Sequence, residues 1–389
     1  MKLIVSIIRT FCLLAAIYLH TVCAAAQADP LARLDSVEIG LLTCSPHGEV
    51  YSLYGHTALH YHNLRTHEHW VFNYGVFDSR KPFFMWHFML GQTDYSLECT
   101  SFFGGFMDYY RRWGSSVEEQ VLDLTRHEKL QLQRALEANL RSPDYRYNVF
   151  YDNCSTRPRD IIERCLDGSV TYAEHEGYSP TLRQIVHQQT EGHPWARYGN
   201  DLLLGLTADC ATTQRERQFL PGNLSWDFDH ATVSRNGVSK ALVLRHVTHV
   251  RGRQQPLKKE FPLSPFACTL LLLGVSILIA LYEWRSRKVA VWWDALLMLA
   301  TGVTGCILLL MFFSQHPTTS TNLQILILNP LSLAFLPQVV RRRKSHWFRI
   351  SAALTVAFYI GGLWQDYADG MEIVALCLLL RFWTHRNDK

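Results

Sequence analysis

The chain has 389 residues, of which 48% are hydrophobic and 19% are charged. A composition this apolar excludes an intrinsically disordered protein, and the length allows two or three domains. The formal net charge of +4 comes from 38 Lys and Arg against 34 Asp and Glu. This balance lacks the strongly basic character typical of nucleic-acid-binding proteins, so we expect no nucleic-acid partner.

The N-terminus has the features of a secretory signal peptide. Lys2 and Arg9 flank an apolar run that continues to Ile17, and the small residues of segment 24–28 follow it. Signal peptidases require small side chains close to the bond that they cleave. We therefore expect residues 1–28 to be a signal peptide, with an uncleaved membrane anchor as the alternative.

Residues 29–250 predict an exported α+β domain. Several short segments combine β-branched and aromatic residues and are bounded by turn-forming residues, which is the pattern of antiparallel strands. These segments are Val37–Thr43, Thr57–Tyr61, His69–Tyr74 and Glu119–Leu124.

Two helices are predicted in the same region. Thr125, with Glu128 three residues later, forms a capping box that opens a helix to about Leu140. A second helix is expected to begin near Cys154. Pro158 must then lie in its first turn, because a proline further inside would cost about 3 kcal/mol.

The C-terminal part predicts an all-α, multi-span membrane domain. Residues 251–263 are interpreted as a linker, and residues 264–389 contain five apolar segments. The last segment is shorter than the ~20 residues that cross a bilayer. The segments are 265–283, 289–313, 323–340, 347–364 and 371–384.

Positive charges predict the orientation of this domain. The loops at 314–321 and 365–370 contain no Lys or Arg, whereas basic residues follow the first and third segments and lie at the end of the fifth. Basic loops stay on the cytoplasmic side. We therefore expect a multi-pass inner-membrane protein whose exported domain lies on the periplasmic face. The basic residues are Arg285, Arg287, Lys288, Arg341, Arg342, Arg343, Lys344, Arg381, Arg386 and Lys389.

Cys154 is the candidate nucleophile. It belongs to an odd set of five cysteines outside the signal peptide and the apolar segments, so at least one of them stays unpaired within the chain. A thiol at a helix N-terminus faces unpaired N–H groups and a positive dipole end, both of which favour the thiolate. A buried structural cysteine is the alternative. The pairing of Cys44, Cys99, Cys165 and Cys210 stays open.

His56 is the candidate base for this thiol. It follows Tyr54 and Gly55 at the start of a predicted strand. His60 and His62 share its strand face, so a zinc site was weighed as an alternative. Because neither an HExxH motif nor a CxxC pair accompanies these histidines, we expect no metal site and no cofactor.

Several sequence blocks then carry a resemblance to a known family. They run in the family's order over residues 37–230, and two short membrane blocks follow. The chain resembles the Lnb-type lipoprotein N-acyltransferases and, more distantly, permuted papain-like enzymes of the NlpC/P60 kind. The blocks are Leu41–Pro46, Tyr54–His56, Asn73–Asp78, Asp152–Arg157, Asp201–Gly205, Phe219–Pro221, His316–Asn322 and Asn329–Pro330.

The resemblance implies a permuted papain-like exported domain with Cys154 and His56 as a catalytic dyad. It also implies transfer of an acyl chain, through a thioester, to the α-amine of diacylglyceryl lipoproteins. The donor would be a phospholipid or the lipoprotein's own glyceryl ester. Two other functions stay open: a membrane-tethered peptidase or amidase acting on cell-wall peptide, and a non-enzymatic envelope scaffold.

Further residues are candidates for binding substrate or a developing oxyanion. Main-chain N–H groups at the helix start are expected to serve the oxyanion. The outer loop after the second span is expected to hold the polar headgroup, with Pro330 interrupting the third span. The side-chain candidates are Tyr51, Tyr54, Asn73, Asn153, Ser155, Arg157, His316, Asn322 and Asn329.

Overall fold

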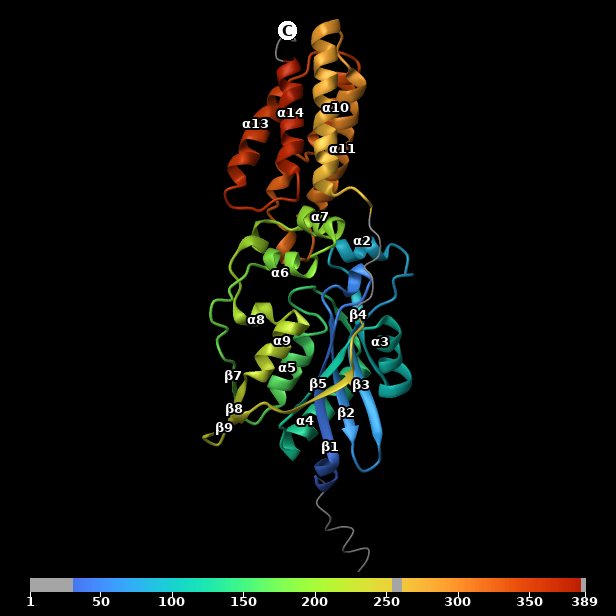
Figure 1. Ribbon diagram of the computed structural model, residues 1–389, viewed down its shortest axis with the longest axis vertical. Coiled ribbons are helices and arrows are strands. Elements are labelled where there is room, and N and C mark those ends of the chain that lie inside the picture. The colour runs from blue at the N-terminus through green and yellow to red at the C-terminus, as the bar shows by residue number, and fades with distance from the viewer. Residues whose placement is uncertain (1–30, 254–260, 386–389) are drawn as a thin grey trace, which may run out of the picture.

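The computed structural model describes residues 31–253 and 261–385. A mixed α/β domain and a bundle of apolar helices follow one another along the long axis of the molecule (Figure 1). The predicted signal peptide lies outside the described residues. So do most of the predicted linker and the basic residues Arg386 and Lys389.

The centre of the α/β domain is a seven-stranded antiparallel sheet in the order β10-β5-β1-β2-β3-β4-β6. Its strands are β1 (Val37–Cys44), β2 (His56–Asn63), β3 (Glu68–Val76), β4 (Asp94–Ser101), β5 (Val117–Leu122), β6 (Asp144–Arg146) and β10 (Val243–Val250). A small three-stranded sheet contains β7 (Ser169–Thr171), β8 (Thr232–Arg235) and β9 (Val238–Ala241).

Helices cover both faces of the large sheet. On one face, Leu41 and Leu59 pack with side chains of α4, α5 and α9. On the other, Leu42 and Ala58 pack against a π-helical turn, Phe102–Met107, and α3. Because neighbouring residues of a strand point to opposite faces, burial of both faces explains the nearly continuous apolar run in β1.

The helices of this domain are short, with α4 the longest. Their bounds are α2 (Phe84–Met89), α3 (Asp108–Trp113), α4 (Arg126–Arg141), α5 (Thr156–Cys165), α6 (Leu182–Gln189), α7 (Pro194–Leu203), α8 (Gln214–Arg217) and α9 (Pro221–Asp229).

The strands and helices predicted from the sequence are confirmed, with shifts of one or two residues at most of their ends. The capping box is present, because the Thr125 side chain accepts from the backbone of Glu128 and the Glu128 side chain accepts from the backbone of Thr125. Pro158 lies in the first turn of α5. One detail differs: a turn separates β6 from α5, so Cys154 does not directly follow a strand.

The membrane bundle contains α10 (Pro265–Ser286), α11 (Val291–Met311), α12 (Leu331–Val340), α13 (Trp347–Gly361) and α14 (Met371–His385). Among the described residues, three helical segments are long and apolar enough to cross a membrane: 265–286, 291–311 and 323–340. The prediction of about five transmembrane helices, the last of them short, thus agrees with the length of three segments and stays a prediction for the other two. At 1.5 Å per residue, the 15 residues of α13 or of α14 extend about 22 Å, less than a ~30 Å hydrocarbon layer.

The third span is interrupted where the sequence predicted it. A short 3-10 turn, Leu323–Leu326, is followed by a break, and α12 starts at Leu331 after Asn329 and Pro330. A Cβ on Gly305 of α11 would lie 2.5 Å from the carbonyl oxygen of Leu328. Gly305 therefore lets the irregular backbone pack directly against α11, which shields it from lipid.

The two parts of the molecule are joined by main-chain hydrogen bonds. The N–H of Gly205 donates to the carbonyl of Thr318 at 2.8 Å, and the N–H of Leu206 donates to Thr321 at 3.1 Å. A Cβ on Gly205 would lie 2.1 Å from the carbonyl oxygen of Ser320. The segment Asp201–Gly205, singled out in the sequence, is thus the docking segment between the α/β domain and the bundle.

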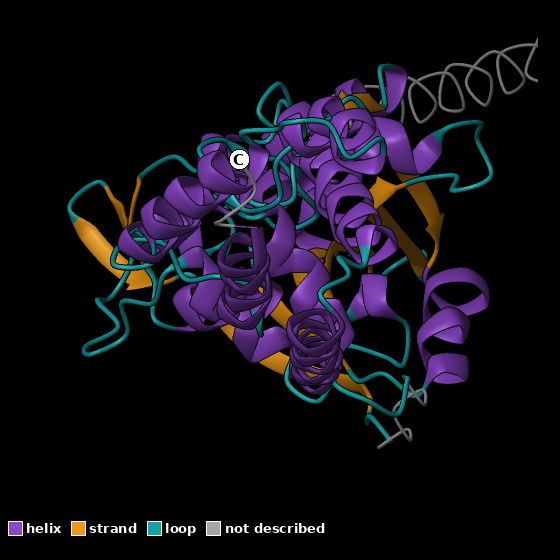
Figure 2. Cartoon of the chain, turned by 90° about the horizontal axis from the view of Figure 1, so that it is seen from above, coloured by secondary structure: helices purple, strands orange, loops and turns teal. Residues whose placement is uncertain are grey.

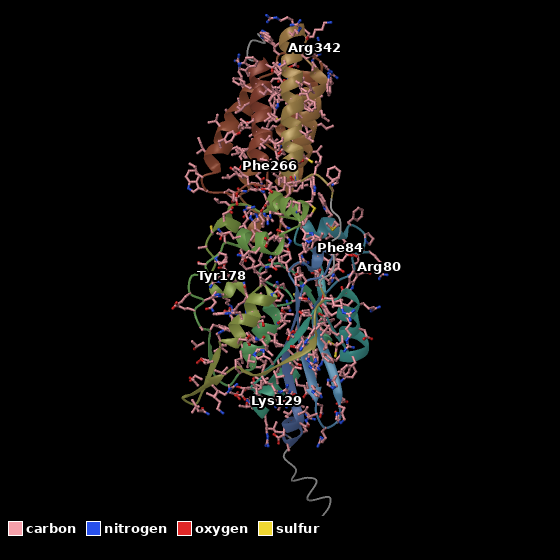
Figure 3. All side chains as sticks on the ribbon, in the orientation of Figure 1. Arg80, Phe84, Lys129, Tyr178, Phe266 and Arg342 are labelled. Carbon is pink, nitrogen blue, oxygen red and sulfur yellow. The ribbon has the colours of Figure 1, made fainter. Side chains whose placement is uncertain are left out.

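The basic cluster after the third span agrees with the predicted orientation. Arg342 lies at the end of the bundle furthest from the α/β domain, whereas Phe266 lies at the near end (Figure 3). Viewed from above, the membrane helices stand side by side over the α/β domain (Figure 2).

Arg381 does not act as an exposed topogenic charge, contrary to the prediction. Its side chain is 2% exposed, and its Nε donates to Asp294 at 2.6 Å while Nη1 donates to Glu283 at 2.7 Å. His385 contacts the second oxygen of Asp294 at 2.9 Å. These residues form a buried ionic cluster that joins α10, α11 and α14.

Candidate active site

Asn153 fixes the position of Cys154 at the start of α5. Its Oδ1 accepts from the main-chain N–H groups of Ser155 at 2.8 Å and Thr156 at 3.0 Å. Its Nδ2 donates to the carbonyls of Val149 at 2.8 Å and Phe219 at 2.9 Å. With its amide satisfied and 4% of its surface exposed, Asn153 is a capping residue and is not available as the oxyanion donor expected from the sequence.

Ser155 anchors the same turn to the sheet. Its hydroxyl is 2.9 Å from that of Thr57 on β2, and its side chain is fully buried. Ser155 and the Thr57 backbone also hydrogen-bond the sulfur of Cys154. Ser155 therefore contacts the thiol from behind, which does not fit the predicted contact with substrate.

Cys154 and His56 are brought together as hydrogen-bond partners. His56 is the first residue of β2, and its Nε2 lies 2.6 Å from Oδ1 of Asn73 on β3. Since an amide oxygen can only accept, Nε2 carries the proton, and Nδ1 is the nitrogen left to face the thiol. Cys154, His56 and Asn73 are all partly exposed. The thiol, imidazole and amide thus form a row.

The electrostatics of the pair favour a charged nucleophile. Burial raises the pKa of Cys154, but the neighbouring charge and hydrogen bond of His56 outweigh it, so the pKa is lowered overall. Burial lowers the pKa of His56, and the Cys154 charge with hydrogen bonds from Cys154 and Asn73 raises it overall. The two shifts both favour a thiolate beside an imidazolium, which is the reactive form of a thiol nucleophile.

Gly75 leaves space next to the thiol. It has φ +93°, and a Cβ placed there would lie 3.4 Å from Cβ of Cys154 and 3.9 Å from Cε1 of His56. The same Cβ would lie 3.9 Å from the hydroxyl oxygen of Tyr145. Gly75 therefore marks a point where the nucleophile, the base and a phenol converge.

The Tyr145 hydroxyl is buried and has no hydrogen-bond partner within the described residues. Burial, and next the charge of the Cys154 thiolate, raise the pKa of Tyr145 far above its usual range. The pKa values of Tyr95 and Tyr147 are raised by the same two causes in the same order. The three phenols therefore stay protonated near the charge of Cys154, and that of Tyr145 is a donor without a partner in the described residues.

A row of stacked rings continues from these phenols toward the membrane. Tyr147 stacks on Tyr95 at 4.0 Å between ring centroids, Tyr95 on Phe77 at 4.8 Å, and Phe77 on Phe84 at 5.3 Å. Phe84 belongs to α2, at the end of the α/β domain that faces the helix bundle (Figures 1 and 3).

Helix α2 exposes a cluster of large apolar side chains. Phe83 is 78% exposed, Met85 65% and Trp86 43%. Next to the membrane bundle, such side chains are suited to the bilayer interface, where aromatic residues concentrate.

The remaining predicted site residues of the α/β domain have partners other than the thiol. Arg157 pairs with Asp152 through hydrogen bonds of 2.6 and 2.8 Å and stacks over the ring of Tyr145. Tyr51 is 60% exposed, and its hydroxyl is 3.4 Å from that of Tyr109. Tyr54 packs beside Phe219.

The outer loop after α11 docks the bundle, in contrast to its predicted role in holding a headgroup. His316 is 7% exposed, and its Nε2 donates to the carbonyl of Phe88 at 2.9 Å. Asn322 is 1% exposed and donates to the carbonyl of Leu202 at 2.9 Å. Asn329 caps the start of α12 by accepting from Leu331 at 3.0 Å. Their polar groups satisfy backbone groups that would otherwise be buried unpaired.

All eight cysteines in the described residues are free thiols. Cys44 and Cys165 are buried, whereas Cys99 and Cys210 are exposed. Burial raises the pKa of Cys44, Cys99 and Cys165. Cys154 thus differs from these three cysteines, because its pKa is lowered whereas theirs are raised.

Sequence reasoning missed Gly75 and Tyr145 and misassigned Asn73. Asn73 and Gly75 stand in one block, Asn73–Asp78, with one residue between them on β3. Alternation along a strand would have placed them on one face. The sequence carried no signal for Tyr145, because β6 is three residues long and pairs with β4 at the edge of the sheet.

Protein-family models match both the α/β domain and the membrane bundle. The Lnb N-terminal periplasmic domain matches residues 26–188, and the Lnb transmembrane domain matches residues 257–388. Comparisons with curated proteins and with solved structures gave no match. Cys154, His56 and Asn73 all lie within the first matched region. The two matches, in this order, cover most of the chain: the protein is a membrane protein with a periplasmic domain and belongs to the Lnb-type lipoprotein N-acyltransferase family.

Proposed function

We propose that the protein transfers an acyl chain from a glycerol ester to the α-amine of a lipoprotein's diacylglyceryl cysteine, with Cys154 as the covalent carrier. The observation that carries the proposal is the row Cys154–His56–Asn73 in a periplasmic domain docked onto a membrane bundle. The cysteine begins a helix, and the His and Asn come from neighbouring strands that precede it. This supports a permuted papain-like interpretation of the domain.

The first half-reaction forms a thioester. The Cys154 sulfur attacks the ester carbonyl, and Nδ1 of His56 holds the thiol proton. The tetrahedral intermediate collapses by breaking the bond to the glycerol oxygen, and His56 returns the proton to that oxygen as it leaves. Asn73 holds the imidazole ring in the orientation and tautomer that this transfer requires.

The oxyanion is stabilised by a phenol and a main-chain amide. The helix-start N–H groups of Ser155 and Thr156 are occupied by Asn153, which leaves the N–H of Cys154 and the Tyr145 hydroxyl as donors. A hydroxyl that has no partner in the resting enzyme bonds the oxyanion without first breaking another hydrogen bond.

The second half-reaction forms the amide. The lipoprotein amine attacks the thioester carbonyl, His56 accepts the amine proton, and the proton returns to sulfur as the carbon–sulfur bond breaks. A thioester is reactive enough toward an amine for this step, so the sequence is ping-pong. No cofactor takes part in the proposed sequence.

In the proposal, the acyl chain follows the ring row from Phe84 to Phe77, which is 39% exposed, and reaches the thiol beside Tyr95 and Tyr147, which are stacked behind it. The exposed side chains of α2 would hold its outer end in the interface. A path from the bilayer to Cys154, together with an inner-membrane location, suits a lipid substrate better than a cell-wall peptide.

The deciding experiment reconstitutes the full chain in vesicles with a phospholipid carrying a radiolabelled acyl chain and a synthetic diacylglyceryl lipopeptide. We expect label in an alkali-stable amide at the peptide N-terminus. A second vesicle set, with label in the lipopeptide's own glyceryl ester, distinguishes the two donors. Cys154→Ser and His56→Ala should each abolish transfer, and the double variant should be no worse than either single one.

Turnover near the wild-type rate in Cys154→Ser would exclude the thiol mechanism. Release of free fatty acid, or cleavage of a cell-wall peptide, without amide formation would identify a hydrolase instead. Lipopeptide binding that is unaffected by either substitution, with no chemistry, would identify a scaffold.

A further inference from the structure

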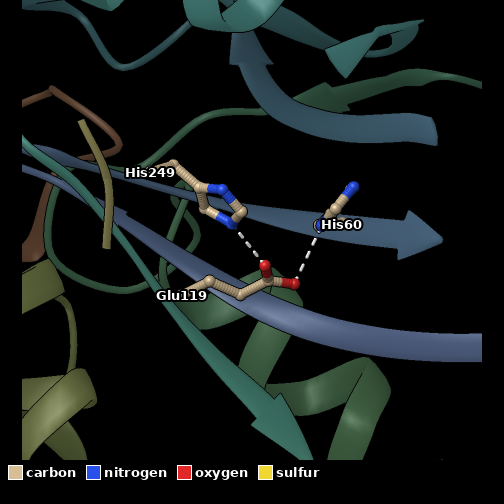
Figure 4. Close-up of side chains that lie close together, drawn as sticks. All are labelled: His60, Glu119 and His249. Carbon is tan, nitrogen blue, oxygen red and sulfur yellow. Dashed lines mark hydrogen bonds and ion pairs between the residues drawn. The ribbon is translucent and has the colours of Figure 1, made fainter. Parts of the chain in front are cut away.

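Two histidines and a glutamate meet on the sheet away from Cys154 (Figure 4). Glu119 of β5 lies between them: one carboxylate oxygen is 2.8 Å from Nδ1 of His60 on β2, and the other is 2.6 Å from Nε2 of His249 on β10. His60 is 2% exposed and Glu119 4%. Their three ligand atoms lie within 4.8 Å of one another.

The sheet leaves space for this cluster. β1 separates β2 from β5, so the Glu119 side chain must cross β1 to reach His60. It crosses at Gly40, which is paired with His60, and a Cβ on Gly40 would lie 2.1 Å from Oε1 of Glu119. Any other residue at position 40 would displace the carboxylate. A glycine within a central strand is unfavourable unless something approaches its backbone closely, as Glu119 does here.

We propose that His60, Glu119 and His249 form a binding site for a divalent transition metal, with Zn²⁺ as the preferred ion. Two imidazoles and one carboxylate are a donor set that zinc uses, with a fourth position for water. Ligands of a tetrahedral zinc lie about 3.3 Å apart, given metal–ligand bonds of ~2.0 Å. The three groups therefore reach this geometry through side-chain shifts of about an ångström.

The surroundings of the cluster suit a metal ligand set. Nε2 of His60 lies 3.1 Å from Nδ1 of His69, so the nitrogen of His60 opposite the metal has an acceptor for its proton. Such partners fix the tautomer of ligating histidines. The ring of Phe102 stacks on His60 at 4.1 Å and covers one side. His249, with 19% of its side chain exposed, is the most accessible of the three ligands and gives an ion access to the site.

The site is separate from the proposed chemistry. His56 and His60 lie four residues apart on β2, which corresponds to about 13 Å along a strand. The metal would have a structural role. It would link the edge strand β10, which carries His249, to the central strands β5 and β2, which carry the other two ligands. The chain continues from β10 toward α10, so the site would secure the last strand before the membrane bundle.

The test measures zinc on the untagged full chain in detergent, after dialysis against micromolar ZnCl₂ and then metal-free buffer. We expect one zinc per chain by elemental analysis and a rise in the thermal midpoint with zinc that EDTA reverses. His249→Ala and Glu119→Gln should each lose the bound zinc and the midpoint rise. His246→Ala is the matched control, because His246 is on the same strand, is 60% exposed and faces Asp229.

Wild-type zinc content no higher than that of His249→Ala would overturn the proposal, leaving a hydrogen-bonded cluster. Equal losses of bound zinc in His249→Ala and in His246→Ala would also overturn the proposal, since the zinc would then be bound elsewhere. Should Glu119→Gln fail to fold, His249→Ala still decides the question, because His249 lies on an edge strand. The readout is metal content and is independent of acyl transfer.

Discussion

Nε2 of His56 lies 2.6 Å from Oδ1 of Asn73 on the neighbouring strand. Because this hydrogen bond sets which imidazole nitrogen faces Cys154, we predict that Asn73→Ala lowers kcat by a factor on the order of 10². KM should change little, since the amide is not expected to touch substrate. Initial rates of acyl transfer measure both constants. Asn139→Ala, which removes a 2.7 Å hydrogen bond to Tyr74 on the same strand, is the control and should retain kcat.

The lowered pKa of Cys154 predicts alkylation at unusually low pH. A lowered pKa means that the thiolate persists until the pH falls through that lower value. The rate of iodoacetamide labelling should therefore have its midpoint below the ~8.5 of an ordinary cysteine. His56→Ala removes the charge and the hydrogen bond that oppose burial most strongly and leaves the weaker effects of Thr57 and Ser155, so the midpoint should move upward. Peptide mass spectrometry follows Cys154 and, as an internal reference, exposed Cys210. Equal midpoints for the two thiols would contradict the prediction.

Gly75→Ala should lower acyl transfer, because the added methyl group fills the space beside the thiol at van der Waals distance from Cys154. A Cβ there meets Cys154 and Tyr145, whereas a Cβ on Gly177, which has a similar φ of +71°, has no neighbour within 4 Å. Both alanine variants carry the strain of a left-handed residue, roughly 1–2 kcal/mol. Gly177→Ala is therefore a matched control for backbone strain. We expect similar thermal midpoints for the two variants and lower activity in Gly75→Ala alone.

Tyr145→Phe tests the proposed oxyanion donor. Because the hydroxyl has no partner in the described residues, its removal leaves nothing unsatisfied and should not destabilise the fold. We expect kcat to fall by a factor on the order of 10² to 10³, with unchanged alkylation of Cys154. Tyr74→Phe is the comparison, since the Tyr74 hydroxyl bonds Asn139. Activity equal to wild type in Tyr145→Phe would assign the oxyanion to main-chain donors alone.

Asn322→Ala should affect stability without affecting chemistry. The buried amide donates to Leu202 and accepts from Gln324 at 3.1 Å and Gln365 at 3.0 Å. Removing it leaves buried groups unpaired, which costs about 1–3 kcal/mol. We expect a lower thermal midpoint in detergent and an unchanged KM for the lipopeptide. Ser320→Ala, in the same loop but partly exposed, should leave both values unchanged. A raised KM in Asn322→Ala would restore the headgroup-binding role expected from the sequence.

The sequence correctly predicted the helices and strands whose bounds depend on residues close to one another in the chain. The capping box of α4 and the β-branched and aromatic composition of β1 and β2 depend on neighbouring residues, so their bounds were nearly correct. His56 was proposed as the base for Cys154 from its residue type and its position at the start of a strand, and the family resemblance strengthened the pairing. The contact itself could not be derived locally, because 98 positions separate the two residues.

The errors concern residues whose roles depend on register and on partners distant in sequence. Asn73 reaches His56 because β3 pairs beside β2, which a single strand pattern does not specify. Glu119 was read as part of an ordinary strand, and the histidines were judged without it, because Gly40 and the strand order bring them together. Arg381 was counted among the cytoplasmic basic residues. Its buried partners Glu283 and Asp294 lie far earlier in the chain, so the sequence did not reveal the ion pairs.

The buried Arg381 cluster has a consequence for biogenesis. Glu283 and Asp294 arrive with the first two spans, before their cation has been synthesised. Until α14 is made, these two carboxylates, one near the end of α10 and the other in the first turn of α11, lack the cation that they pair with in the complete protein. Completion of the chain supplies the guanidinium that neutralises them. A protein truncated before α14 would keep both carboxylates without their guanidinium partner, so assembly of the first two helices should be complete only after the last one is in place.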